Sequence, residues 1–143
     1  MDLLDTNVVS ELRKLRSGRA DVEVSRWAST APAGEFFISV ITLMELETGV
    51  LLVSRRDPAQ GALLRAWMDG QVIPGFAGRV LPVDDAVALR CAALHVPDPR
   101  PERDALIAAT ALVHGMTVVT RNVADFAPMG VALLNPWMAG ATG

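Results

Sequence analysis

Short, continuous apolar runs alternate with segments of helical periodicity along this chain, and this alternation limits the folds open to it. The apolar runs lie at residues 1–4, 36–39, 80–83, 117–120 and 131–134. Strands that are apolar on both faces and alternate with helices imply a parallel sheet covered on both sides. We therefore predict an α/β fold, a three-layer α/β/α sandwich around a central parallel sheet of four to five strands.

The segments between these runs carry signals for helix starts and ends. Helices are expected over residues 6–16, 21–30, 42–53 and 102–114, and two more are expected to begin after Asp57 and Asp84. Gly115 follows the last of these helices and is expected to form a left-handed C-cap. In such sheets ligands bind outside the carboxyl ends of the strands, so the residues just after each strand are the site candidates.

Composition limits the classes further. Of the 143 residues, 51% are apolar and 20% are charged, which excludes a disordered chain and favours a single domain over residues 1–143. The single cysteine, Cys91, excludes a disulfide framework and a cysteine-rich zinc site. No basic segment follows Met1, and the uncharged helical run 105–120 is shorter than a membrane span. We expect a cytoplasmic protein that does not enter a membrane.

The charged residues exclude other enzymes. Lys14 is the only lysine among 13 basic residues, and the remainder are arginines. Phosphatases of the haloacid dehalogenase kind need a second aspartate two residues after the first, where this chain has Asn7, and a lysine from a late strand. The net charge of −3 gives no reason to expect binding to duplex DNA.

Four acidic residues are candidates for a site at the carboxyl edge of the sheet: Asp5, Glu45, Asp104 and Asp125. Asp5 follows the first strand directly, Glu45 lies in the first turn after the second strand, and Asp125 follows the fourth. Asp104 faces the same crevice only if its helix starts there, and the sequence leaves this open. Converging carboxylates repel one another unless a cation lies among them, and hard oxygen ligands suit Mg²⁺ or Mn²⁺.

Each acid also has a purely structural interpretation. Thr42 and Glu45 have the spacing of a capping box, and Asp104 would be favourable at a helix start through the helix dipole. Asp125 could be an ordinary turn residue. Asp5 is the hardest to explain in this way, because an acid next to a buried strand is costly unless it has partners.

Four segments of the chain together resemble the PIN-domain toxins of the VapC type. They are Leu-Leu-Asp5-Thr-Asn-Val-Val-Ser-Glu, Ser39-Val-Ile-Thr-Leu-Met-Glu45-Leu-Glu-Thr-Gly49, Asp104-Ala-Leu-Ile-Ala-Ala-Thr-Ala and Thr117-Val-Val-Thr-Arg-Asn-Val-Ala-Asp125-Phe. The segment from Phe76 to Asp84 and the ending Asn135-Pro-Trp137 are closest to the FitB-like branch. The resemblance extends over essentially the whole chain.

The resemblance implies a Mg²⁺- or Mn²⁺-dependent endoribonuclease that acts as the toxin of a type II toxin–antitoxin pair. It makes the four acids both the catalytic residues and the metal ligands, with Asp5 and Asp104 as the principal ligands. Positions that support the acids or the substrate are Thr6, Asn7, Thr120, Arg121 and Asn122. The partners implied are RNA, a cognate antitoxin, and a second copy of the chain in a homodimer or a toxin–antitoxin hetero-oligomer.

This chain departs from the FitB-like branch at two places. The fourth acid of that branch can directly follow Thr-Arg, where this chain has Asn122, so either Asn122 or Asp125 supplies the fourth position. The corner before Asp104 is short and rich in proline. A PIN-fold module that only binds RNA or a partner protein is the alternative function.

Overall fold

The computed structural model describes residues 1–138, and a parallel sheet of five strands lies at its centre. The strands are β1 (Asp2–Leu4), β2 (Phe36–Ser39), β3 (Val80–Leu81), β4 (Thr117–Val119) and β5 (Leu133–Leu134). Their order across the sheet is β3-β2-β1-β4-β5, so β1 is central and pairs with both β2 and β4. The predicted parallel sheet is confirmed. Residues 139–143 of the expected single domain lie outside the described residues.

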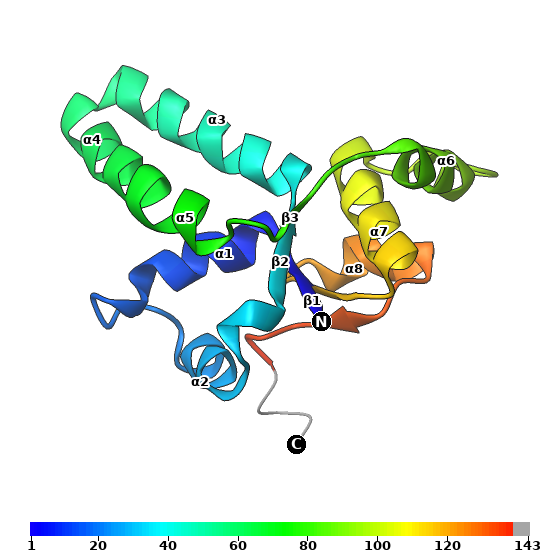
Figure 1. Ribbon diagram of the computed structural model, residues 1–143, viewed down its shortest axis with the longest axis horizontal. Coiled ribbons are helices and arrows are strands. Elements are labelled where there is room, and N and C mark those ends of the chain that lie inside the picture. The colour runs from blue at the N-terminus through cyan, green and yellow to red at the C-terminus, as the bar shows by residue number, and fades with distance from the viewer. Residues whose placement is uncertain (139–143) are drawn as a thin grey trace.

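Helices cover both faces of this sheet (Figure 1). The α-helices are α1 (Thr6–Leu12), α2 (Val22–Thr30), α3 (Val40–Arg56), α4 (Pro58–Trp67), α5 (Ile73–Gly75), α6 (Asp85–Leu94), α7 (Glu102–His114) and α8 (Val123–Phe126). Shorter turns are η1 (Arg13–Leu15), η2 (Ala33–Glu35), the π-helical η3 (Met68–Val72) and η4 (Ala127–Met129). The three-layer arrangement is the predicted one.

Successive residues of the central strands supply two separate cores. Leu3 and Val118 face α6, α7 and α8, and the alanines of α7 allow this helix to lie close to the sheet. Leu4 and Val119 face the opposite side, where Val8 and other apolar residues of α1, α3 and η3 pack against them. Because the ends of these central strands are buried on both faces, they carry successive apolar residues, Leu3–Leu4 and Val118–Val119, rather than alternating ones.

Several element ends differ from the prediction. The helix expected over residues 6–16 ends at Leu12 and continues as the 3₁₀ turn η1. The helix expected from residue 42 begins at Val40, because the Ser39 hydroxyl caps it by accepting from the Ile41 backbone N–H at 3.0 Å. The strand expected over residues 80–83 ends at Leu81, just before Pro82, which has no N–H for the ladder.

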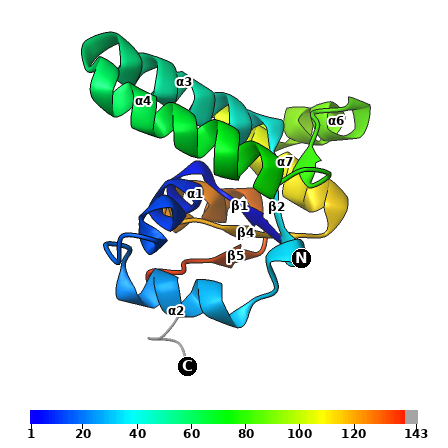
Figure 2. The ribbon, with the colours of Figure 1, turned by 60° about the vertical axis from the view of Figure 1, so that its left-hand side comes forward.

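Helices α3 and α4 form an antiparallel pair that extends beyond the sheet (Figure 2). Gly61 of α4 is buried against α3, and a Cβ at this position would lie 2.2 Å from Ser54 Oγ and 2.4 Å from Ser54 Cα. The absence of a side chain at Gly61 therefore sets the close spacing of the two helices.

Among the described residues, no helix is both long and apolar enough to cross a bilayer.

Candidate active site

Asp5 lies at the carboxyl end of β1 and is almost fully buried, with 5% of its surface exposed. Its carboxylate caps α1, because Oδ1 accepts from the Thr6 backbone N–H at 2.8 Å. Oδ2 accepts from the Thr120 hydroxyl at 2.7 Å. A buried carboxylate is costly unless it has hydrogen-bond partners. The start of α1 and the end of β4 supply these partners to Asp5.

A polar network behind Asp5 connects the ends of β1 and β4. The buried Thr120 hydroxyl, which donates to Asp5, accepts from the Asn122 backbone N–H at 3.0 Å. Asn7 Oδ1 accepts from the Arg121 backbone N–H at 3.3 Å, and Asn7 Nδ2 lies 3.4 Å from Asp5 Oδ2. The five predicted supporting positions therefore all take part in contacts that fix the orientation of Asp5 or the turn after β4.

Glu45 approaches this edge from α3. One carboxylate oxygen accepts from the Thr6 hydroxyl at 2.7 Å, and the other lies 3.5 Å from the Arg103 guanidinium. The capping-box interpretation of Glu45 is wrong, because Ser39 is the cap and Thr42 is buried inside α3, with its hydroxyl 3.3 Å from that of Thr6. Glu45 is therefore directed toward the start of α1 rather than toward its own helix end.

Asp104 and Asp125 complete the acidic edge from α7 and α8. The pKa of Asp104 is raised to about 6, first by partial burial and then by the negative charges of Asp5, Asp125 and Glu45. The adjacent Arg103 lies 3.5 Å from Glu45, so the first turn of α7 approaches the crevice, which the sequence left open. Asp125 is exposed, and its backbone N–H donates to the Asn122 carbonyl at 3.1 Å. The turn interpretation of Asp125 and its place beside the other acids are therefore both satisfied.

The protonation of Asp5 reflects opposing effects. Burial raises the pKa of this carboxyl most, and the charges of Glu45 and Asp125 raise it further. Hydrogen bonds from Thr120 and Thr6 act in the opposite direction, because they stabilise the charged carboxylate. The net effect is a pKa above the ordinary value, as expected where negative charges gather without a counter-ion.

The donor set fits a hard divalent cation in its chemistry. All four donors are carboxylates, and the charges of Glu45 and Asp125 raise the pKa of both Asp5 and Asp104. Within residues 1–138, however, no three histidine, cysteine or acidic side chains lie close enough together to hold a metal ion. A cation held by one or two of the carboxylates, with water completing its shell, does not need such a group of three.

Two residues near the acids have contacts that sequence reasoning did not predict. Arg103 precedes Asp104 and pairs with Glu45, yet only the three-dimensional approach of α7 to α3 brings the two together. The guanidinium of Arg121 lies 4.9 Å from the ring centre of Trp137, as a cation–π contact. Among the described residues, no carboxylate lies within ion-pair distance of Arg121.

Comparison with protein families gives a match to the PIN domain over residues 3–128. Characterised proteins include relatives that match nearly the whole chain. The VapC ribonuclease Y4jK of Sinorhizobium fredii is 34% identical over 142 residues, covering 96% of this chain and 98% of the relative. Toxin FitB of Neisseria gonorrhoeae is 36% identical over 143 residues, covering 96% and 99%.

A solved structure agrees with these relatives. The crystal structure of FitAcB from Neisseria gonorrhoeae superposes with a TM-score of 0.86 at 34% sequence identity. The superposition covers 96% of this chain and 99% of that one. The similarity thus extends to the order and packing of the elements that carry the four acids.

Proposed function

This chain belongs to the PIN domain family, and we propose that it is a metal-dependent endoribonuclease, the toxin of a type II toxin–antitoxin pair. One observation of the molecule carries the proposal: Asp5 and Glu45 both bind Thr6 at the carboxyl edge of the sheet, where the charges of Glu45 and Asp125 also raise the pKa of Asp5 and Asp104. Such an accumulation is unfavourable without a cation, and a phosphodiester-cleaving site gives it a purpose.

Asp5 and Asp104 would be the principal ligands of the cation, and Glu45 and Asp125 would complete the site directly or through water. Mg²⁺ or Mn²⁺ bound there would polarise a phosphoryl oxygen and lower the pKa of water. We assign the fourth position to Asp125 rather than Asn122, because the charge of Asp125 raises the pKa of both Asp5 and Asp104.

The protein groups around the acids hold them in place for hydrolysis of an RNA phosphodiester. Thr120 and the Thr6 backbone N–H fix the Asp5 carboxylate from two sides, so it does not rotate when substrate arrives. The Thr6 hydroxyl fixes Glu45 in the same way, and Arg103 offsets part of its charge. We place Arg121 beside the scissile phosphate only after it leaves the face of Trp137.

The proposal includes partners and a location. Residues 1–143 form one PIN domain that acts in the cytoplasm and binds a cognate antitoxin, either as a homodimer or in a toxin–antitoxin hetero-oligomer. The acidic edge would attract a basic segment of such an antitoxin. Among residues 1–138 no three potential metal ligands lie together, and this favours one alternative, a PIN-fold module that binds RNA or a partner protein without cutting RNA.

The test is cleavage of a mixed pool of single-stranded RNA by purified, antitoxin-free protein. Reactions contain Mg²⁺ or Mn²⁺, or EDTA, and Asp5→Ala protein from the same preparation procedure controls for contaminating nucleases. We expect cutting that requires metal and is lost in the variant. Folded wild-type protein that binds the RNA but leaves it intact with either metal would support the binding module instead.

A further inference from the structure

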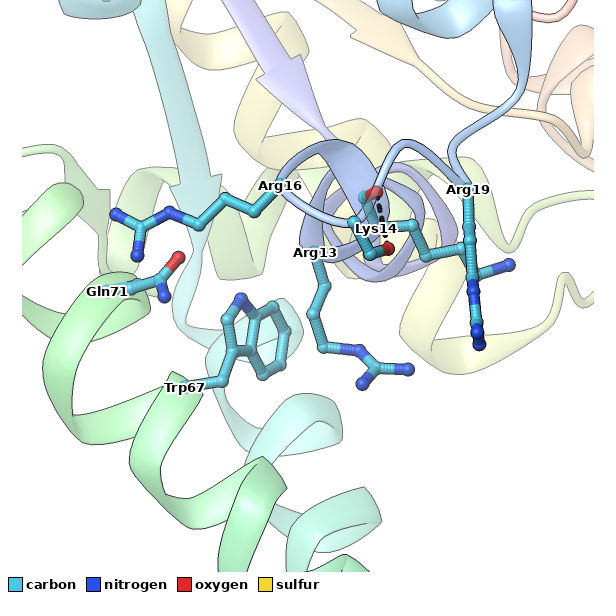
Figure 3. A pocket seen from close by; sticks show the side chains of 7 residues that line it. Arg13, Lys14, Arg16, Arg19, Trp67 and Gln71 are labelled. Carbon is cyan, nitrogen blue, oxygen red and sulfur yellow. Dashed lines mark hydrogen bonds between the residues drawn. The ribbon is translucent and has the colours of Figure 1, made fainter.

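A second polar region lies away from the acids, in a groove of about 530 Å³ between η1 and the end of α4 (Figure 3). The groove is lined by Arg13, Lys14, Arg16, Ser17, Arg19, Trp67 and Gln71. Four of the 13 basic residues of the chain thus line one hollow, which contains no acidic side chain. In Figure 3 the Trp67 indole is directed from α4 toward η1, with the Arg13 guanidinium beside it.

Most of this positive charge is not neutralised within the described residues. Lys14 pairs with Glu11 at 3.1 Å, whereas Arg16 and Arg19 are exposed and have no acidic partner among residues 1–138. Glu47 and Asp69, on the neighbouring α3 and η3, both pair with Arg65 instead. The groove therefore has a positive field although the chain as a whole carries a charge of −3.

The groove also leads to the acidic edge. A shallower hollow of about 240 Å³ lies along α1 and is lined by Thr6 and Glu45 at one end and by Arg13 and Trp67 at the other. Arg13 and Trp67 line the basic groove as well, so the two hollows share a wall. Helix α1 has seven residues, so this path is about 10 Å long.

We propose that the basic groove binds the sugar–phosphate backbone of single-stranded RNA beside the nucleotide held at the acidic edge, an inference that rests on the proposed ribonuclease function. An arginine guanidinium group can bind a phosphate through two parallel N–H···O hydrogen bonds. Unpaired bases commonly stack on an aromatic ring that lies beside a positively charged groove. Trp67 supplies the ring, Arg13 connects it to the acidic hollow, and Arg16 and Arg19 hold the phosphates that follow.

The experiment measures binding of a fluorescent single-stranded RNA oligonucleotide as a function of salt, in an Asp5→Asn background that prevents cutting. The groove variant is Arg16→Glu/Arg19→Glu, and the matched control is Arg56→Glu/Arg90→Glu, which makes the same charge change at exposed positions on α3 and α6. Thermal melts establish that all variants fold. We expect the groove variant to bind RNA about ten- to hundredfold more weakly, with little change in the control. The slope of the logarithm of the binding constant against the logarithm of salt concentration should decrease in magnitude by about 1.4, because two phosphate contacts are lost.

Equal weakening in both double variants would overturn the proposal, because net charge alone would explain it. So would unchanged RNA binding by the groove variant. A polyglutamate peptide of matched charge is the second probe. If the groove variant loses peptide binding but keeps RNA binding, the groove is assigned to an acidic protein segment instead.

Cutting by the active enzyme separates this proposal from the ribonuclease proposal. If the groove binds RNA that wild-type protein does not cut with Mg²⁺ or Mn²⁺, the ribonuclease proposal fails and the groove proposal stands. If the Arg16→Glu/Arg19→Glu variant with Asp5 intact cuts RNA as well as wild type at limiting RNA concentration, the groove proposal fails and the ribonuclease proposal stands.

Discussion

The acidic edge and the basic groove lie at opposite ends of α1 and are built in opposite ways. At the acidic edge, short side chains are held by hydrogen bonds between residues far apart in the sequence, such as Thr120 and Asp5. In the groove, long side chains from one short segment, including Arg16 and Arg19, extend into solvent without acidic partners. The first region fixes positions and the second supplies charge.

This difference follows from what each region has to do. Under the proposed function, catalytic groups must be held within a fraction of an ångström, and Asp5 is accordingly buried with a hydrogen bond to each of its oxygens. Groups that follow a flexible polyanion gain from mobility and from weak hydration, which exposed arginines provide. Four predictions test whether this contrast holds, from the largest expected effect to the smallest.

Asp104→Asn should cause the largest change in activity. We expect RNA cleavage to fall by about 10²–10³-fold, because a proposed ligand loses its charge. The melting temperature in EDTA should stay the same or rise, because the substitution removes repulsion from Asp5, Glu45 and Asp125. Cleavage rates and thermal melts check this, and a variant that is both inactive and much less stable would contradict it.

Thr120→Val should affect both activity and stability. The substitution keeps the shape of the buried side chain but removes the hydroxyl that donates to Asp5 and accepts from the Asn122 N–H. We expect a loss of about 1–3 kcal/mol in the free energy of unfolding and about 10–100-fold in cleavage. Thr120→Ser, which keeps the hydroxyl, should recover most of the activity. If Thr120→Val cuts normally, the hydroxyl does not position Asp5.

The burial of Asp104 and the repulsion at the acidic edge should together appear as a pH dependence of stability. The folded-state pKa of Asp104 is about 6, against 3.8 in the unfolded chain, so between these values the folded state binds more protons. In EDTA, stability should therefore fall as pH rises from about 4 to 6, by about 1–2 kcal/mol after allowance for solvent screening.

Urea unfolding across this pH range, with Asp104→Asn as the control, measures the effect. The decline should be smaller in Asp104→Asn. In wild type at pH 7.5, millimolar Mg²⁺ should raise the melting temperature by binding the folded state. A decline of the same size in the variant would assign it to other carboxyls.

Arg16→Gln should show the smallest effect on the fold. The Arg16 side chain is exposed and has no acidic partner among the described residues, so we expect less than about 0.5 kcal/mol change in stability. Urea unfolding at pH 7.5 checks this value. A loss above about 1 kcal/mol would mean that the groove is a structural element, and the contrast with Thr120 would disappear.

The fold could be predicted well from the sequence, because the signals for strands and for helix ends are local. Buried strands require continuous apolar runs, and helices such as α7 begin after proline and end at Gly115, whose φ is 66°. Element ends were harder to predict. Ser39 and Thr42 are equally good caps by chemistry, and the packing of Thr42 inside α3 decides between them.

The two functional regions differ in the same respect. The acids could be proposed from sequence because parallel strands place their carboxyl ends together, although only the structure showed that the first turn of α7, which holds Asp104, approaches Glu45 through Arg103. The groove could not be proposed from the sequence. Residues 13–19 have the composition of a solvated surface, and a single tryptophan such as Trp67 is usually a packing residue. Only the fold brings these distant segments together.

Gly61 helps to determine the width of the basic groove, although it does not line the groove. Trp67 is the last residue of α4, and its distance from η1 depends on how deeply α4 lies against α3. That depth is set at Gly61, where even one methyl group would collide with Ser54. Substitution of Gly61 by a residue with a side chain would move the Trp67 indole and change the distance between the two sides of the groove. No residue proposed to contact RNA would itself be altered.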